Sequence, residues 1–103
     1  MQPEHIDRYK AVGRNIAFYR KSMGYSQDAL ADKVGISRTH LSRIETASCA
    51  ASLDILFNLA DVLDIDPCLF FQNIGWKSDG ATEKEHALIS DLTKCVIRHM
   101  REP

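Results

Sequence analysis

Four side chains between residues 38 and 43 carry groups that can hydrogen-bond to the edges of nucleic-acid bases. They are Arg38, Thr39, Ser42 and Arg43, with no large apolar residue on the same side of the helix that they are expected to form. Arginine reads guanine through a bidentate contact to O6 and N7, and threonine can meet a thymine methyl group or an acceptor. This chemistry suits the major groove of double-stranded DNA, so we expect these four residues to contact bases.

Residues around this face are expected to contact phosphates. The amide groups at the helix starts near Gln27 and Ser37 can point at phosphate oxygens, assisted by the helix dipole. His40 lies toward the edge of the same face, and Arg14 is the fourth expected phosphate contact. For Arg38, Arg43 and His40, the alternative is an ordinary solvated side chain.

Two short helices must position these residues. Ser26 is a suitable N-cap for a helix over 27–34, and Ser37 for a helix over 38–46. Gly35 can adopt the positive φ that a tight turn between them requires. The two helices share an apolar seam of Leu30, Val34, Ile36, Leu41 and Ile44. This pattern predicts a helix-turn-helix unit.

Three further helices complete a predicted domain over residues 6–71. The first spans residues 6–23, with apolar residues at helical spacing. Another spans residues 53–63, and a proline after Asp66 opens a short fifth helix through Phe71. The expected inward residues of the helix over 53–63 are Leu53, Leu56, Ala60 and Leu63. The predicted fold class is therefore all-α, a five-helix domain with an additional C-terminal helix.

The additional helix is predicted over residues 82–101, after a linker over 72–81 that contains Trp76, a candidate anchor on the core. Thr82 and Glu85 form a capping box that begins this helix. We expect its apolar face to pair with a second copy of the chain, through Leu88, Leu92, Val96 and Met100. The sequence leaves open whether this helix instead covers residues 53–63 of its own chain.

Composition excludes several other classes of protein. The net charge is −1, but residues 1–45 contain eight Lys or Arg against five acidic residues, whereas residues 46–71 contain four acidic residues and no Lys or Arg. Only the first part therefore suits phosphate. The three cysteines show no C-x-x-C spacing and are expected to be free thiols of a reducing compartment. No catalytic constellation, metal site, cofactor motif, signal peptide or membrane span is recognisable, so we expect a cytoplasmic protein that is not an enzyme.

Residues 12–71, roughly sixty of the 103, resemble the lambda-repressor-like, XRE-type helix-turn-helix family. The residues that match at the family's spacing are Gly13, Arg14, Ile16, Arg20, Ser26, Gln27, Leu30, Ala31, Gly35, Ile36, Ser37, Ser42, Glu45, Leu53, Leu56, Leu59, Ala60, Leu63, Leu69 and Phe70. The resemblance implies a sequence-specific transcriptional regulator that binds double-stranded DNA, with residues 38–46 as its recognition helix.

The resemblance also implies roles for individual residues. Gln27 matches a glutamine that meets phosphate and braces the recognition helix, and Arg20 and Glu45 match a structural pair. The chain departs from the family after residue 46, because Ala47 stands where glycine is common, and Ser48 and Cys49 where basic residues are common. We therefore expect fewer phosphate contacts from this loop and a modest salt dependence of DNA binding.

The expected assembly is a homodimer, a repressor that reads an inverted-repeat operator. The competing hypothesis is an interaction module, such as an antitoxin or adaptor, whose acidic part and C-terminal helix bind another protein.

Overall fold

Serine residues begin three successive helices of the computed structural model, which describes residues 1–75. The Oγ atoms of Ser26, Ser37 and Ser52 each accept a backbone N–H three residues later, at 3.0, 3.0 and 3.2 Å. Each bond satisfies a donor that the first helical turn would otherwise leave without a partner. The elements in chain order are η1 (Pro3–His5), α1 (Ile6–Ser22), α2 (Gln27–Val34), α3 (Arg38–Glu45), α4 (Leu53–Leu63) and η2 (Pro67–Phe71).

Gly35 ends α2 in the left-handed conformation that the sequence predicts. Its φ is 82°, and its N–H donates to the carbonyl of Ala31 at 2.9 Å. Two residues later Ser37 caps α3, so the chain changes direction within a very short turn. The predicted helix-turn-helix unit is therefore present.

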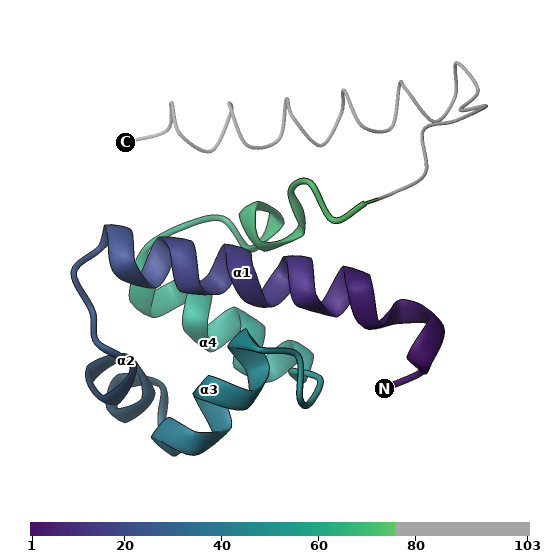
Figure 1. Cartoon of the computed structure of the whole chain (residues 1–103). Helices are drawn as coiled ribbons and strands as arrows, with labels where there is room; N and C mark the ends of the chain where they lie inside the picture. Colours follow the sequence, from purple (N-terminus) through teal and green to yellow (C-terminus); the bar gives the residue numbers. More distant parts are fainter. Residues whose placement is uncertain (76–103) are drawn as a thin grey trace.

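α1 runs across the middle of the molecule (Figure 1), with α3 and η2 packed against it, whereas α2 packs against α3 and α4. In that view α2 and α3 lie below α1, α4 lies behind it, and η2 lies above it. The largest fully buried side chains come from all of these elements: Ile16, Leu30, Leu41, Leu59, Leu63 and Phe70. Residues 1–75 contain no strand and no helix long and apolar enough to cross a bilayer.

The predicted count of five helices is not matched: the described residues contain four α-helices, and the short fifth helix expected through Phe71 is a 3-10 helix at residues 67–71. Asp66 does cap this segment, accepting the N–H of Cys68 at 2.8 Å, and proline follows it as expected. The N–H of Leu69 then bonds to the carbonyl of Asp66, three residues back, at 3.0 Å. A five-residue segment is too short to gain from α-helical bonds, and 3-10 turns are common in such short pieces.

The prediction that Leu53 faces inward is also wrong, because Leu53 is 64% exposed and is not part of the core. It is the first residue of α4, and the buried stripe consists of Leu56, Leu59, Ala60 and Leu63. Periodicity gives the direction of a side chain but not whether another element extends far enough to cover it.

The linker from residue 76 onward and the predicted helix over 82–101 lie outside the described residues, as do Trp76 and the four expected pairing residues.

Candidate nucleic-acid interface

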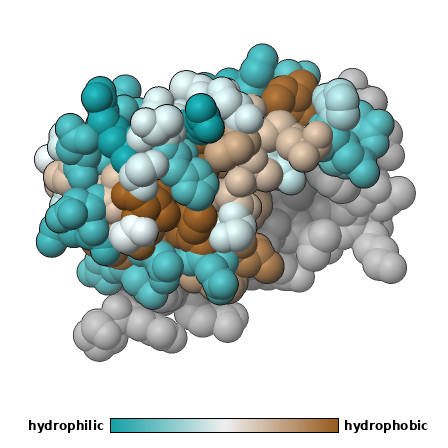
Figure 2. All heavy atoms as spheres, turned by 90° about the horizontal axis from the view of Figure 1, so that it is seen from below, coloured by the Kyte–Doolittle hydropathy of each residue, from teal (hydrophilic) through white to brown (hydrophobic). Residues whose placement is uncertain are grey.

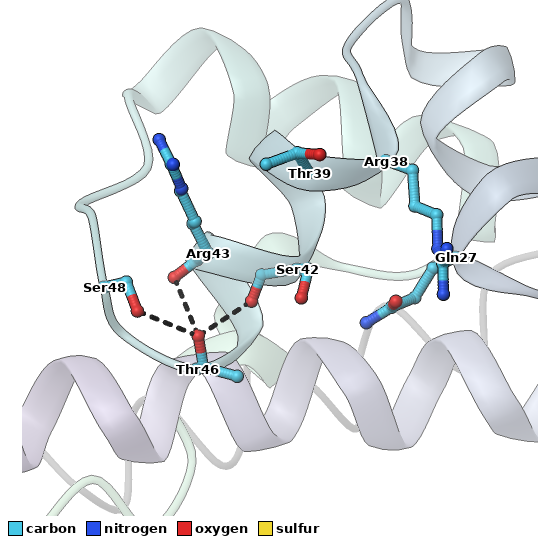
Figure 3. Close-up of a pocket in the computed structure, with 7 residues that line it drawn as sticks. All are labelled: Gln27, Arg38, Thr39, Ser42, Arg43, Thr46 and Ser48. Carbon is cyan, nitrogen blue, oxygen red and sulfur yellow. Dashed lines mark hydrogen bonds between the residues drawn. The ribbon is translucent and has the colours of Figure 1, made fainter.

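A polar hollow lies along the outward side of α3. It is lined by Gln27, Arg38, Thr39, Ser42, Arg43, Thr46 and Ser48 (Figure 3). The structure thus brings together all four residues predicted to contact bases. Arg38, Thr39 and Arg43 are exposed, and Ser42 is half-buried. A solvent-accessible group of hydroxyl and guanidinium donors is suited to hydrogen-bond with base edges.

The opposite side of α3 anchors the helix in the core. Leu41 is fully buried and Ile44 is 3% exposed. Burial of these two residues orients the helix, so the polar residues on its other side point away from the core. Hydrophilic residues cover much of the surface seen from below, on the side where α2 and α3 lie, although apolar areas interrupt them (Figure 2).

An ion-pair network fixes the end of α3 against α1. The Nε atom of Arg20 lies 2.7 Å from Oε2 of Glu45, and Nη2 lies 3.1 Å from Oε1. Nη1 of Arg20 also donates to the carbonyl of Tyr25 at 3.0 Å. The side chains of Arg20 and Glu45 are only 9% and 5% exposed. A charge pair this deeply buried is costly to separate, because each partner would lose its counter-charge without regaining water.

Gln27 extends this network to the start of α2. Its Nε2 atom donates to Oε1 of Glu45 at 3.0 Å. An amide nitrogen carries two protons, so the same group has a second N–H with which to meet a phosphate. One side chain therefore connects the buried ion pair to the surface of the hollow.

Gly13 allows α1 to approach the end of α3 closely. A Cβ atom at this position would lie 2.7 Å from the carbonyl oxygen of Ile44 and closer still to that of Glu45. Gly13 was predicted only as a residue that matches the family, and its close contact with α3 was not predicted. The available signal was a glycine inside an amphipathic helix, where it costs stability relative to alanine unless packing requires it.

Thr46 and Ser48 are lining residues that the sequence analysis did not assign. The Thr46 hydroxyl donates to the carbonyl of Ser42 at 2.9 Å and lies 3.2 Å from the Ser48 hydroxyl (Figure 3). The N–H of Ser48 donates to the carbonyl of Arg43 at 2.8 Å. Between them Ala47 has a φ of 61°, in the left-handed region. Glycine, which adopts this region without strain, is common at this position in the family. This turn directs the chain back along α3 and places Ser48 at the hollow.

The remaining residues predicted to meet phosphates, Arg14, Ser37 and His40, do not line the hollow. Arg14 and Ser37 are exposed, and His40 is half-buried. The Ser37 oxygen accepts the N–H of His40, which leaves the hydroxyl proton available to a phosphate oxygen. Their contacts with DNA remain predictions.

The described residues include two cysteines but no arrangement of side chains suited to a metal ion. Cys49 and Cys68 are half-buried thiols. Within residues 1–75, no group of three or more His, Cys, Asp or Glu side chains is arranged to hold a metal ion.

Known proteins resemble this chain in sequence and in structure. Residues 16–70 match the family model described as Helix-turn-helix. The HTH-type transcriptional regulator SinR of Bacillus subtilis is 38% identical over 55 residues, which is 52% of this chain and 50% of SinR. The uncharacterized HTH-type transcriptional regulator YazB of the same organism is 42% identical over 53 residues, 52% of this chain and 77% of YazB. The match thus spans only about half the length of SinR.

Two solved structures share the arrangement of the helices. The restriction-modification controller protein C.AhdI from Aeromonas hydrophila superposes with a TM-score of 0.59 and 32% identity, over 63% of this chain and 97% of that chain. The complex of the SinR and SinI proteins gives a TM-score of 0.57 and 28% identity, over 80% of this chain and 78% of that chain.

Proposed function

The chain belongs to the XRE-type helix-turn-helix family, and from this membership we propose that it is a transcriptional regulator that binds double-stranded DNA sequence-specifically. Arg38, Thr39, Ser42 and Arg43 of α3 read base edges in the major groove. The single observation that carries this proposal is the two-sidedness of α3, with Leu41 and Ile44 buried and all seven residues of the opposite hollow polar.

Phosphate contacts orient the protein on the duplex. Gln27 approaches a phosphate while it remains bonded to Glu45, and Ser37 offers its hydroxyl at the start of α3. Arg14 and His40 contribute at the edges of the interface. Such contacts set the position of α3 without carrying sequence information.

The regulator acts as a homodimer and as a repressor in the cytoplasm, and it has no enzymatic activity. Two-fold symmetry places the two copies of α3 about 34 Å apart, one turn of DNA, so the operator is an inverted repeat. The transcriptional regulators that the chain resembles support the regulatory role. The pairing surface is the apolar face of the predicted helix over 82–101, Leu88, Leu92, Val96 and Met100.

A second candidate function is that of an antitoxin or adaptor that binds another protein. The observation that favours it is an apolar area on α4, where Leu53 and Phe57 are 64% and 49% exposed, one helical turn apart. Asp54 and Asp61 of the same helix are also exposed. A protein partner with a basic, apolar surface would complement this combination. One solved structure similar to this chain is that of a protein complex, SinR with SinI.

Selection of bound duplexes from a random pool by the full chain tests the first proposal. We expect enrichment of an inverted repeat with half-sites about 10 base pairs apart. Sedimentation of the chain alone and with the enriched duplex then gives the number of copies in each complex. A monomer that enriches no duplex and shows no salt-sensitive DNA binding would contradict the regulator and favour the adaptor.

A further inference from the structure

Asp28, in the first turn of α2, is an acidic residue beside a surface that is proposed to bind a polyanion. Its Oδ1 atom lies 3.8 Å from Nε of Arg38, and the two side chains are 75% and 66% exposed. We propose that Asp28 is a specificity-determining residue. It positions Arg38 for a guanine base, and it weakens non-specific binding, in which Arg38 would contact only phosphates. This inference rests on the proposed function and assigns a role to a residue outside the base-reading and phosphate-contacting sets.

The geometry of the pair leaves the base-reading end of the arginine available. Asp28 approaches Nε, whereas guanine O6 and N7 are read by two parallel N–H donors, which the terminal Nη atoms can supply. The Arg38 side chain extends toward α2, where Gln27 is labelled, while Arg43 points away from it (Figure 3). The two arginines of α3 are thus held differently, because Arg38 and not Arg43 has a carboxylate partner among the ion pairs described for residues 1–75.

Stability of the fold does not account for the pair. Both side chains are mostly exposed, and ion pairs of this kind contribute little to the free energy of unfolding. We therefore expect the Asp28 carboxylate to affect DNA binding, because the negatively charged phosphates of the duplex would lie close to it.

Asp28 affects the two kinds of complex unequally. A phosphate carries a full negative charge, so the nearby carboxylate repels it and partly neutralises the arginine that would bind it. A guanine edge is neutral, so the nearby carboxylate reduces the binding free energy of its contact with Arg38 much less. Because phosphate pairing is the same on every sequence, Asp28 lowers non-specific affinity more than specific affinity. The result is a larger ratio between the two affinities.

The chain offers a matched control in Asp32. It is an exposed aspartate on the same helix, one turn after Asp28. Asp32→Asn removes the same charge as Asp28→Asn without removing the partner of Arg38. The comparison separates positioning of one arginine from a general change in net charge.

The test uses the full chain, the duplex that it enriches from a random pool, single-base-pair variants of that duplex, and an unrelated duplex. The proteins are the wild type, Asp28→Asn, Asp32→Asn, Arg38→Ala, and Arg38→Ala combined with Asp28→Asn. Affinities are measured at several salt concentrations, and thermal unfolding of each variant verifies that it is folded.

For Asp28→Asn we expect tighter binding to the unrelated duplex and a preference at one base pair that falls by about threefold to tenfold, part of what one bidentate contact supplies. Asp32→Asn should change both affinities by the same factor and leave every base preference as it is. With Arg38→Ala already present, Asp28→Asn should no longer alter any base preference.

Three results would overturn the inference while leaving the proposed function in place. They are an unchanged base preference in Asp28→Asn, equal effects of Asp28→Asn and Asp32→Asn, and an effect of Asp28→Asn on base preference that persists without Arg38. A wild-type chain that enriches no duplex overturns both the inference and the function on which it rests.

Discussion

The guanidinium of Arg20 contacts both carboxylate oxygens of Glu45, at 2.7 and 3.1 Å, and so joins two helices across 25 positions of the chain. Glu45 is the last residue of α3, and Arg20 lies near the end of α1. The pair therefore fixes the end of α3 against α1. Gln27, which is proposed to contact a phosphate, donates a hydrogen bond to the same glutamate. We therefore expect the stability of the fold and the proposed DNA binding to depend on the same buried carboxylate.

Replacing Arg20 with methionine should lower the free energy of unfolding by about 3–5 kcal/mol, because Glu45 would keep its charge in a buried position without its main partner. The measurement is chemical denaturation followed by circular dichroism. Lys21→Met is the control, since Lys21 is exposed on the same helix and its loss should be nearly neutral. Equal denaturation midpoints for the two variants would contradict a structural role for the pair.

Replacing Gly13 with alanine should destabilise the fold by about 1–3 kcal/mol, the usual cost of overpacking. The new methyl group would meet the backbone carbonyls of Ile44 and Glu45, which cannot move as a flexible side chain would. The same assay applies, with Lys10→Ala as the control at an exposed position of α1. A Gly13→Ala variant more stable than the wild type, as helix propensity alone favours, would show that α1 and α3 are not in this close contact.

Replacing Arg43 with alanine should weaken binding to the preferred duplex by about 1–3 kcal/mol and relax the preference at one base pair. The reason is the loss of a guanidinium that is exposed at the hollow. Mobility shifts on the preferred and on random duplexes measure both effects, and Lys21→Ala removes one positive charge away from the hollow as the control. Equal losses on the two duplexes would make Arg43 a phosphate contact only.

Replacing Leu88 and Leu92 together with glutamate should convert the proposed dimer to a monomer, because two charges would enter an apolar pairing surface. Sedimentation of the full chain measures this. The matched control replaces Leu53 and Phe57 with glutamate, which puts two charges on the exposed side of α4 and should leave the dimer intact. The opposite pattern would place the dimer surface on α4 instead of on the predicted helix over 82–101.

Local chemistry was sufficient to predict the helix-turn-helix unit. The caps at Ser26 and Ser37 and the positive φ of Gly35 depend on neighbouring residues, so the sequence indicates both helices and the turn between them. Helical spacing was likewise sufficient to put Arg38, Thr39, Ser42 and Arg43 on one side of α3, opposite Leu41 and Ile44.

Other features depend on contacts between distant residues. Ser48 reaches the hollow because the chain turns back at Ala47, whose positive φ is one that alanine does not favour by itself. The distance between Gly13 and the end of α3 likewise follows from how two helices pack. So does the exposure of Leu53, whose apolar character pointed to the core.

By itself, then, the sequence determined the four α-helical segments of residues 1–75, where α2 and α3 begin, and which residues α3 turns outward, because each of these follows from interactions within a few residues. Only the tertiary structure decided what each face meets: Gln27 bonds to Glu45, Asp28 lies beside Arg38, and Gly13 lies against the end of α3. These depend on the distances between whole elements, which no local pattern encodes.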